Sequence, residues 1–135
     1  YYVCRLSVDR SKTKRRVGTI TISGTAEPFK YDICSTSEDW LWDTFDFEQN
    51  VIREYKQISI NAYNKEVVLL GETMPQVPIF TVKDANELRF AYSGRTYDML
   101  QDGTYRFPDL NVDNDVTLNF SGSGIVTIDY RGAYL

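Results

Sequence analysis

The sequence predicts an all-β protein whose antiparallel strands pack as a sandwich or barrel. Short runs of alternating apolar and polar residues recur along the chain, with turn-forming residues between them. Ten Tyr and seven Phe occur among 135 residues, and aromatic side chains favour strands. No segment with the helical spacing of apolar residues is as long as an average helix. These three observations together favour β structure throughout.

The first predicted element is a β-hairpin formed by strands over residues 2–8 and 17–23. The second run alternates apolar and polar residues, which is typical of a half-buried strand. Between the two runs lies the basic segment DRSKTKRR, which suits a solvated hairpin tip. Gly24 and Pro28 are expected to end the second strand, because proline cannot donate a ladder hydrogen bond. A domain boundary is therefore expected near residues 24–33.

An irregular stretch, STSEDWLWDTFDFEQN, covers residues 35–50. Ser35 and Glu38 have the spacing of a capping box, which predicts a single helical turn. The aromatic residues of this stretch occur at positions 40, 42, 45 and 47, and they keep no helical period. We expect a loop that contains one short turn.

Strand signals then continue to the end of the chain. Turn residues separate them, notably Asp84–Asn86, Ser93–Gly94 and the Ser-Gly-Ser-Gly segment at 121–124. The segment at 92–95 has the composition of a tight hairpin turn, and the one at 121–124 is also expected to be a turn. Strands are expected over residues 51–63, 66–70, 77–82, 87–93, 95–100, 104–110, 115–121 and 124–131.

The charge is unevenly distributed along the chain, whose net charge is −4. Residues 1–16 carry six basic residues and one acidic residue, whereas the other 119 residues carry nine basic and eighteen acidic residues. No aromatic residues are interleaved with the basic ones, so nucleic-acid binding is not expected. No apolar run approaches the ~18 residues that a membrane span needs. Neither nucleic acid nor membrane is therefore a predicted partner.

Catalytic chemistry is poorly represented in the sequence. There is no histidine, which excludes Ser-His-Asp and Cys-His catalysis and most zinc sites. No phosphate-binding glycine motif is present. Cys4 and Cys34 are expected to be buried or half-buried thiols, although a bridge between them is not excluded by the sequence. We predict no enzyme activity, no catalytic residue, no cofactor and no metal site.

Two acidic segments have features of a catalytic or metal site. Five carboxylates surround Trp40 and Trp42, and a glycosidase uses paired carboxylates beside aromatic platforms. A solvated acidic loop with core aromatics is the simpler interpretation, with sugar stacking on Trp40 and Trp42 as the alternative. The segment from Asp109 to Asp115 has the spacing that opens a calcium loop, but Asn114 and Phe120 replace the required Gly and Glu. A turn is the preferred interpretation there.

Four segments resemble siphophage distal tail proteins, the hub proteins at the tip of long non-contractile tails. They are YYVCRLSVDR with GTITISGTAEPFKYDI, then DWLWDTFDFEQNVIREY, then TYRFPDLNV, and finally VTLNFSGSGIVTIDYRGAYL. The resemblance extends over nearly the whole chain. It rests on a pattern of small strands and turns and includes no catalytic signature.

The resemblance implies an architecture and a role. Residues 1–28 would be the last hairpin of an N-terminal ring domain, and residues 29–135 a C-terminal jelly-roll sandwich similar to galectins and carbohydrate-binding modules. The last strand would complete this sandwich, with residues 131–135 as a tail over its edge. The family forms a hexameric ring in the virion tail, assembled in the bacterial host cytoplasm. Its partners are the tail tube, the tip and receptor-binding proteins.

Two hypotheses follow for the chain. The first is a structural component of a bacteriophage or prophage tail tip, or baseplate, without enzyme activity. The second is a carbohydrate-binding module that attaches to host cell-wall saccharide, with Trp40 and Trp42 as the stacking residues. The resemblance leaves open whether the chain forms oligomers by itself, because the ring contacts would lie mainly ahead of residue 1.

Overall fold

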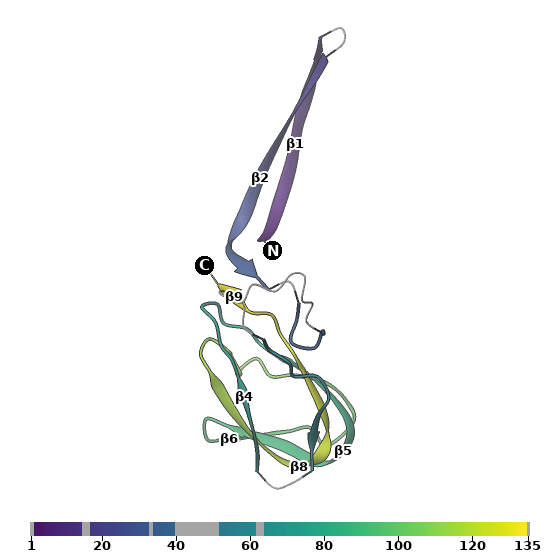
Figure 1. Ribbon diagram of the computed structural model, residues 1–135, viewed down its shortest axis with the longest axis vertical. Helices are drawn as coiled ribbons and strands as arrows, with labels where there is room; N and C mark the ends of the chain where they lie inside the picture. Colours follow the sequence, from purple (N-terminus) through teal and green to yellow (C-terminus); the bar gives the residue numbers. More distant parts are fainter. Residues whose placement is uncertain (1, 15–16, 33, 40–51, 62–63, 135) are drawn as a thin grey trace.

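The computed structural model describes residues 2–14, 17–32, 34–39, 52–61 and 64–134, and it confirms an all-β fold. A long hairpin projects from one end of a β-sandwich (Figure 1). The first two strands build the hairpin, and seven further strands follow among the described residues. The bounds are β1 Tyr2–Lys14, β2 Val17–Tyr31, β3 Ile58–Ile60, β4 Lys65–Leu69, β5 Ile79–Tyr92, β6 Arg95–Asp98, β7 Gly103–Arg106, β8 Val116–Asp129 and β9 Ala133–Tyr134.

The sandwich is one six-stranded antiparallel sheet that folds back on itself. Its two long strands, β5 and β8, pair with each other along their lengths. The sandwich has two layers, and one half of each of these strands lies in each layer. In the first layer, the beginning of β5 pairs with β7 and the end of β8 pairs with β3. In the second, the end of β5 pairs with β6 and the beginning of β8 pairs with β4. Each layer therefore has four strands.

A contact within β5 shows that the strand doubles back. Phe80 and Phe90 are ten residues apart, which in an extended strand corresponds to about 33 Å. Their ring centroids are only 5.2 Å apart, with the rings nearly parallel. The two halves of β5 therefore face each other across the core.

The bend in both strands, which we call the crease, comprises residues 83–89 of β5 and 121–124 of β8. The β5–β8 register shifts twice here, between Lys83 and Asn86 and again between Asn86 and Arg89. Asp84 and Glu87 have positive φ angles of 54° and 50°. Such bulges with left-handed residues bend a strand sharply. The expected turns at 84–86 and 121–124 are thus wrong, because both segments are bends inside continuous strands.

The core fills the space between the two layers. Residues facing inward alternate along β5 and β8, as the period of a half-buried strand requires. Phe90 contacts the rings of Phe80, Tyr97, Phe107 and Phe120 at centroid distances of 4.9–5.6 Å. The largest fully buried side chains among the described residues are Phe80, Phe90, Phe120, Ile60, Leu69, Leu88, Met99, Leu110, Leu118, Ile128, Val82 and Val112.

The hairpin is longer than the sequence predicts, because β2 continues past Gly24 and Pro28 to Tyr31. The reason lies in the register. Between the pairs Cys4–Ala26 and Tyr2–Lys30, β2 has two more residues than β1. Pro28 lies in this bulge, where its missing N–H is not needed for the ladder. The strand ends at Tyr31, within the range where the boundary was expected.

Four other expectations can be compared with the structure. Residues 34–39 form a turn in which the Ser35 N–H donates to Glu38 Oε2 at 2.8 Å, as half of a capping box would. The strand expected over 51–63 is β3 alone among the described residues of that range. The predicted hairpin at 92–95 is confirmed, with positive φ at Ser93 and Gly94. The expected C-terminal tail contains a short strand, β9, which pairs with β2.

Gly122 is the residue at which the crease tolerates least change. A Cβ there would lie 2.3 Å from the carbonyl oxygen of Glu87, and its φ is +90°. We predict that Gly122→Ala costs at least about 3 kcal/mol of folding free energy, since it adds overpacking to backbone strain. Urea unfolding followed by circular dichroism measures this loss.

Gly94→Ala is the matched control for that variant. Gly94 also has a positive φ, +76°, but nothing lies within 4 Å of its hypothetical Cβ. Only the conformational cost of about 1 kcal/mol applies there. Equal losses for the two variants would show that close packing at the crease contributes nothing.

Candidate assembly interface on the hairpin

The hairpin has one apolar face that no described residue covers. Leu6 lies opposite Gly24 and Val8 opposite Ile22, and directly opposed residues share a face. Ile20 lies on the same face as Ile22 because side chains alternate along a strand. Leu6, Val8, Ile20 and Ile22 are each 62–68 % exposed. We call these four side chains the hairpin apolar face.

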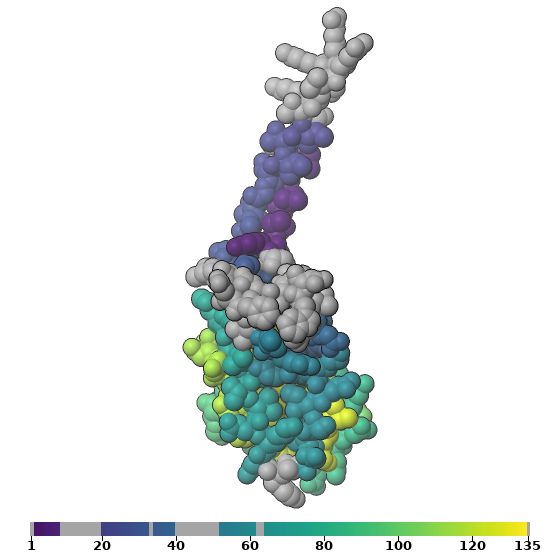
Figure 2. Space-filling model, in the orientation of Figure 1, coloured from purple at the N-terminus to yellow at the C-terminus, as the bar shows by residue number. Residues whose placement is uncertain are grey.

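The opposite face of the hairpin is polar at the ladder pairs that alternate with these residues. Arg5 pairs with Thr25 and Ser7 with Ser23 in the ladder, so these side chains share the second face. The hairpin is therefore amphipathic in the manner of a strand pair that lies on a core. Figure 2 shows its coloured part standing clear of the sandwich, so the sandwich does not provide that core.

The hairpin backbone is also open to pairing. Among the described strands the order is β1-β2-β9, so β1 has a neighbour on one side only, and β9 pairs with β2 at Lys30 and Tyr31. A two-stranded hairpin is marginally stable on its own in water. Long edges beside exposed apolar side chains are templates for association with another chain. Both features favour an interface.

The base of the hairpin is fixed to the sandwich by backbone hydrogen bonds. Asp32 donates its N–H to the carbonyl of Gly132 and Thr36 donates to that of Tyr130, both at 3.0 Å. The Thr36 hydroxyl donates to the Ile128 carbonyl at 2.7 Å. Residues 32 and 34–36 thus continue from β2 along the end of β8. Lys30 adds a cation–π contact of 5.2 Å with the Tyr134 ring of β9.

A buried guanidinium connects three segments at this base. Arg53, whose side chain is 4 % exposed, forms ion pairs with Asp32, at 2.7 Å, and with Glu72. Its Nε has no hydrogen-bond partner in the described part of the chain. Gly132 packs against the pair, since a Cβ there would lie 2.4 Å from Asp32 Oδ2 and 2.8 Å from Arg53 Nη1. The Asp32–Arg53–Glu72 group therefore joins the end of β2 to the sandwich.

The two carboxylates of this group share one positive charge, and the pKa of Asp32 is raised. Burial raises the pKa of the Asp32 carboxyl above its ordinary 3.8, against the lowering effect of Arg53, and the Glu72 charge raises it further. No sequence pattern predicts this group, because its members lie about twenty residues apart and in different predicted elements.

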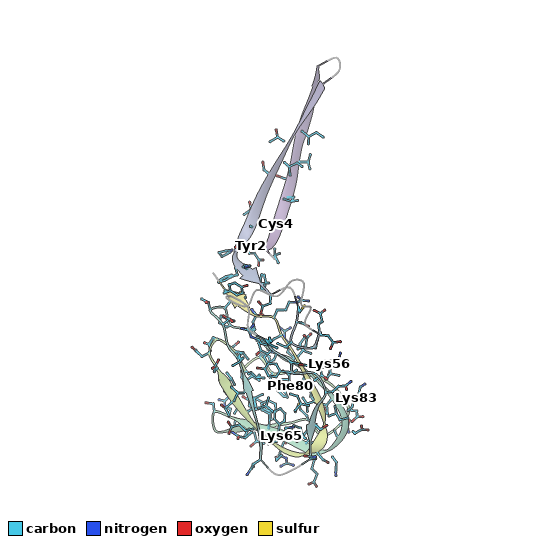
Figure 3. All side chains as sticks on the ribbon, viewed as in Figure 1. Tyr2, Cys4, Lys56, Lys65, Phe80 and Lys83 are labelled. Atoms are coloured by element: carbon cyan, nitrogen blue, oxygen red, sulfur yellow. The ribbon has the colours of Figure 1, made fainter. Side chains whose placement is uncertain are left out.

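The site residues predicted from the sequence are distributed differently. Trp40 and Trp42 lie outside the described residues, so stacking of sugar on them stays a prediction. Cys4 is exposed on the hairpin (Figure 3), contrary to the expected burial, whereas Cys34 is half-buried; both are free thiols. Asp109 pairs with Arg95 at 3.3 Å, and Asp115 accepts a hydrogen bond from Gly71 N–H. These contacts direct two members of the calcium-like segment to separate partners.

Searches of the described ranges for other kinds of site gave two results. They contain no group of three or more Cys, Asp or Glu side chains placed to hold a metal ion. They also include no helix long and apolar enough to cross a lipid bilayer.

Comparisons with family models, curated proteins and solved structures found no match.

We predict that Arg53→Met and Asp32→Asn have very different effects on folding stability. Removing Arg53 leaves two half-buried carboxylates facing each other, which costs about 3–5 kcal/mol. Asp32→Asn keeps one guanidinium with one carboxylate, so its loss is expected to stay below about 1 kcal/mol. Chemical denaturation of both variants measures the contrast, and a larger loss for Asp32→Asn would contradict it.

The variant Asp32→Asn also tests the pKa of Asp32. The folded state holds this proton more tightly than the unfolded chain, so Asp32 favours folding below pH 3.8. That contribution is lost as the pH rises through the raised pKa. Wild-type protein should therefore lose stability relative to Asp32→Asn over this interval, in paired denaturation series at increasing pH. A constant difference would show that Asp32 has an ordinary pKa.

Proposed function

We propose that the chain is a structural subunit of a bacteriophage or prophage tail tip, of the distal tail hub type, and that it has no enzyme activity. In this proposal the hairpin belongs to the ring-forming part and the sandwich is a jelly-roll domain directed outward. The single observation that supports it most is the hairpin apolar face, which the described residues leave uncovered.

The size of this face supports assembly through several contacts at once. Covering four aliphatic side chains contributes about 2 kcal/mol each, or roughly 8 kcal/mol. Association of two molecules costs an estimated ~4–15 kcal/mol in lost freedom of motion. The apolar face alone therefore gives a weak pair. Stable association requires strand-edge pairing as well, as a closed ring of subunits would supply.

Charge supports the same direction of assembly. Residues 1–16 carry a net charge of +5, from six basic residues and one acidic residue, while the remaining 119 residues carry −9. Most of the basic residues lie in the segment of the hairpin tip. A basic arm on an acidic body favours contact between the arm of one copy and the body of the next, and disfavours contact between bodies.

Native mass spectrometry on the product of the full reading frame that encodes this chain tests the proposal. A closed assembly of about six copies is expected, as cyclic symmetry allows. Leu6→Thr with Ile22→Thr should shift the population to smaller species, because Thr keeps the strand propensity while removing apolar surface. A monomeric wild-type protein would contradict the proposal.

The control places the same residue type on the other face of the hairpin. Ser7→Thr with Ser23→Thr changes two opposed residues of the polar face, and the assembly should remain intact. If both double variants assemble equally well, the apolar face is not the interface.

A further inference from the structure

A polar cleft lies at the crease. Figure 1 shows this bend of β5 and β8 at the end of the sandwich remote from the hairpin. Its volume is about 450 Å³, within the range of small-molecule sites, roughly 300–1,000 Å³. It is formed by three segments that are distant in sequence: the end of β3, the bulged part of β5 and the middle of β8. The lining residues are Asn61, Asn86, Glu87, Arg89, Ser121, Gly122 and Ser123.

The crease itself creates this cleft. Gly122 allows the backbone of Glu87 to pass directly against β8. Because of the two register shifts, Asn86 and Glu87 depart from the regular alternation of inward and outward side chains in β5. The next residue, Leu88, is buried in the core. Left-handed residues such as Glu87 cost free energy and concentrate at functional sites. Three polar residues of β5, Asn86, Glu87 and Arg89, therefore line one hollow.

The polar groups of the cleft have no competing partners within the chain as described. The side chains of Asn61, Asn86, Glu87, Ser121 and Ser123 form no hydrogen bond to any described residue. Arg89 has only a long, exposed ion-pair contact of 3.8 Å with Asp98. Another cleft, lined by described residues beside the hairpin base, has side chains that already pair with each other. There Ser37 donates to Asp129 at 2.9 Å, and Arg131 contacts Glu38.

The charge and hydrogen-bonding capacity of the cleft select among ligand classes. One guanidinium and one carboxylate cancel, which disfavours phosphate, nucleic acid and metal ions. The other four side chains are amides and hydroxyls, each of which both donates and accepts hydrogen bonds. A sugar hydroxyl also does both, so a ring bearing several hydroxyls can satisfy this set.

We propose that the crease cleft binds a neutral saccharide. The cleft is distinct from Trp40 and Trp42, and the proposal does not depend on the assembly role of the hairpin. The described lining residues include no aromatic side chain for stacking, so binding of a small sugar is expected to be weak, roughly millimolar. A repeating polysaccharide would strengthen it through many subunits of one assembly.

A nuclear magnetic resonance titration of ¹⁵N-labelled chain tests the proposal. The probes are lactose, cellobiose, maltose and N,N′-diacetylchitobiose, each added to millimolar concentration. At least one is expected to shift the side-chain amides of Asn61 and Asn86 and the backbone amides of Ser121–Ser123. Asn86→Ala should weaken the binding about tenfold, the effect of losing one or two hydrogen bonds.

Asn119→Ala is the matched control, because Asn119 is an exposed amide of β8 that does not line the cleft. It should leave the affinity unchanged. The proposal is overturned if none of the four probes shifts the cleft resonances. It is equally overturned if the shifts occur only at the tryptophan indoles and persist in Asn86→Ala, which would place the sugar at Trp40 and Trp42. Either outcome leaves the hairpin assembly experiment unaffected.

Discussion

The doubling back of β5 and β8 is the constraint on which the sandwich depends. One half of each strand lies in each layer, so the core forms only if both strands bend at the same level. Phe80 and Phe90 then stack across the interior although they belong to one strand. The bend needs a point where two backbones approach more closely than a side chain permits, and Gly122 provides it against Glu87.

Asp102 supports the bend from the β6–β7 connection by accepting a hydrogen bond from the Ala85 N–H at 2.8 Å. This bond and the Asp84 N–H lower the pKa of the Asp102 carboxyl.

A second constraint operates at the other end of the sandwich, and it is electrostatic. Burying Arg53 is costly unless it is paired, and its two carboxylate partners come from the end of β2 and from the segment after β4. The pairing therefore holds the base of the hairpin in a defined place beside Gly132. Backbone hydrogen bonds from residues 32 and 36 act in the same place. The hairpin consequently leaves the sandwich from a fixed base, which an arm that mediates assembly requires.

Much of the fold could be predicted from local pattern, and the failures share a physical cause. Alternation identified the core strands, and Ser93–Gly94 identified the β5–β6 hairpin, because these signals are local. The crease escaped prediction since Asp, Asn, Ser and Gly serve both in chain-reversing turns and in bulges, and only the partner strand decides between them. Pro28 was misjudged for the same reason, because its tolerance depends on the register with β1. The Arg53 group and the cleft were not predictable, since both join residues from separate segments, and Trp40 and Trp42 lie outside the described residues.

The two ends of the molecule have opposite physical character, and this separation bears on both proposals. At the hairpin, apolar side chains and open strand edges leave surface that only another polypeptide can satisfy well. At the crease, amide and hydroxyl groups and one pair of opposite charges line a hollow with no net charge, which suits a small polar ligand. The rigid sandwich between them keeps the two surfaces apart, so occupation of one end does not obstruct the other. An assembly formed through the hairpins would therefore present its clefts outward as an array, in which many weak saccharide contacts add to a strong attachment.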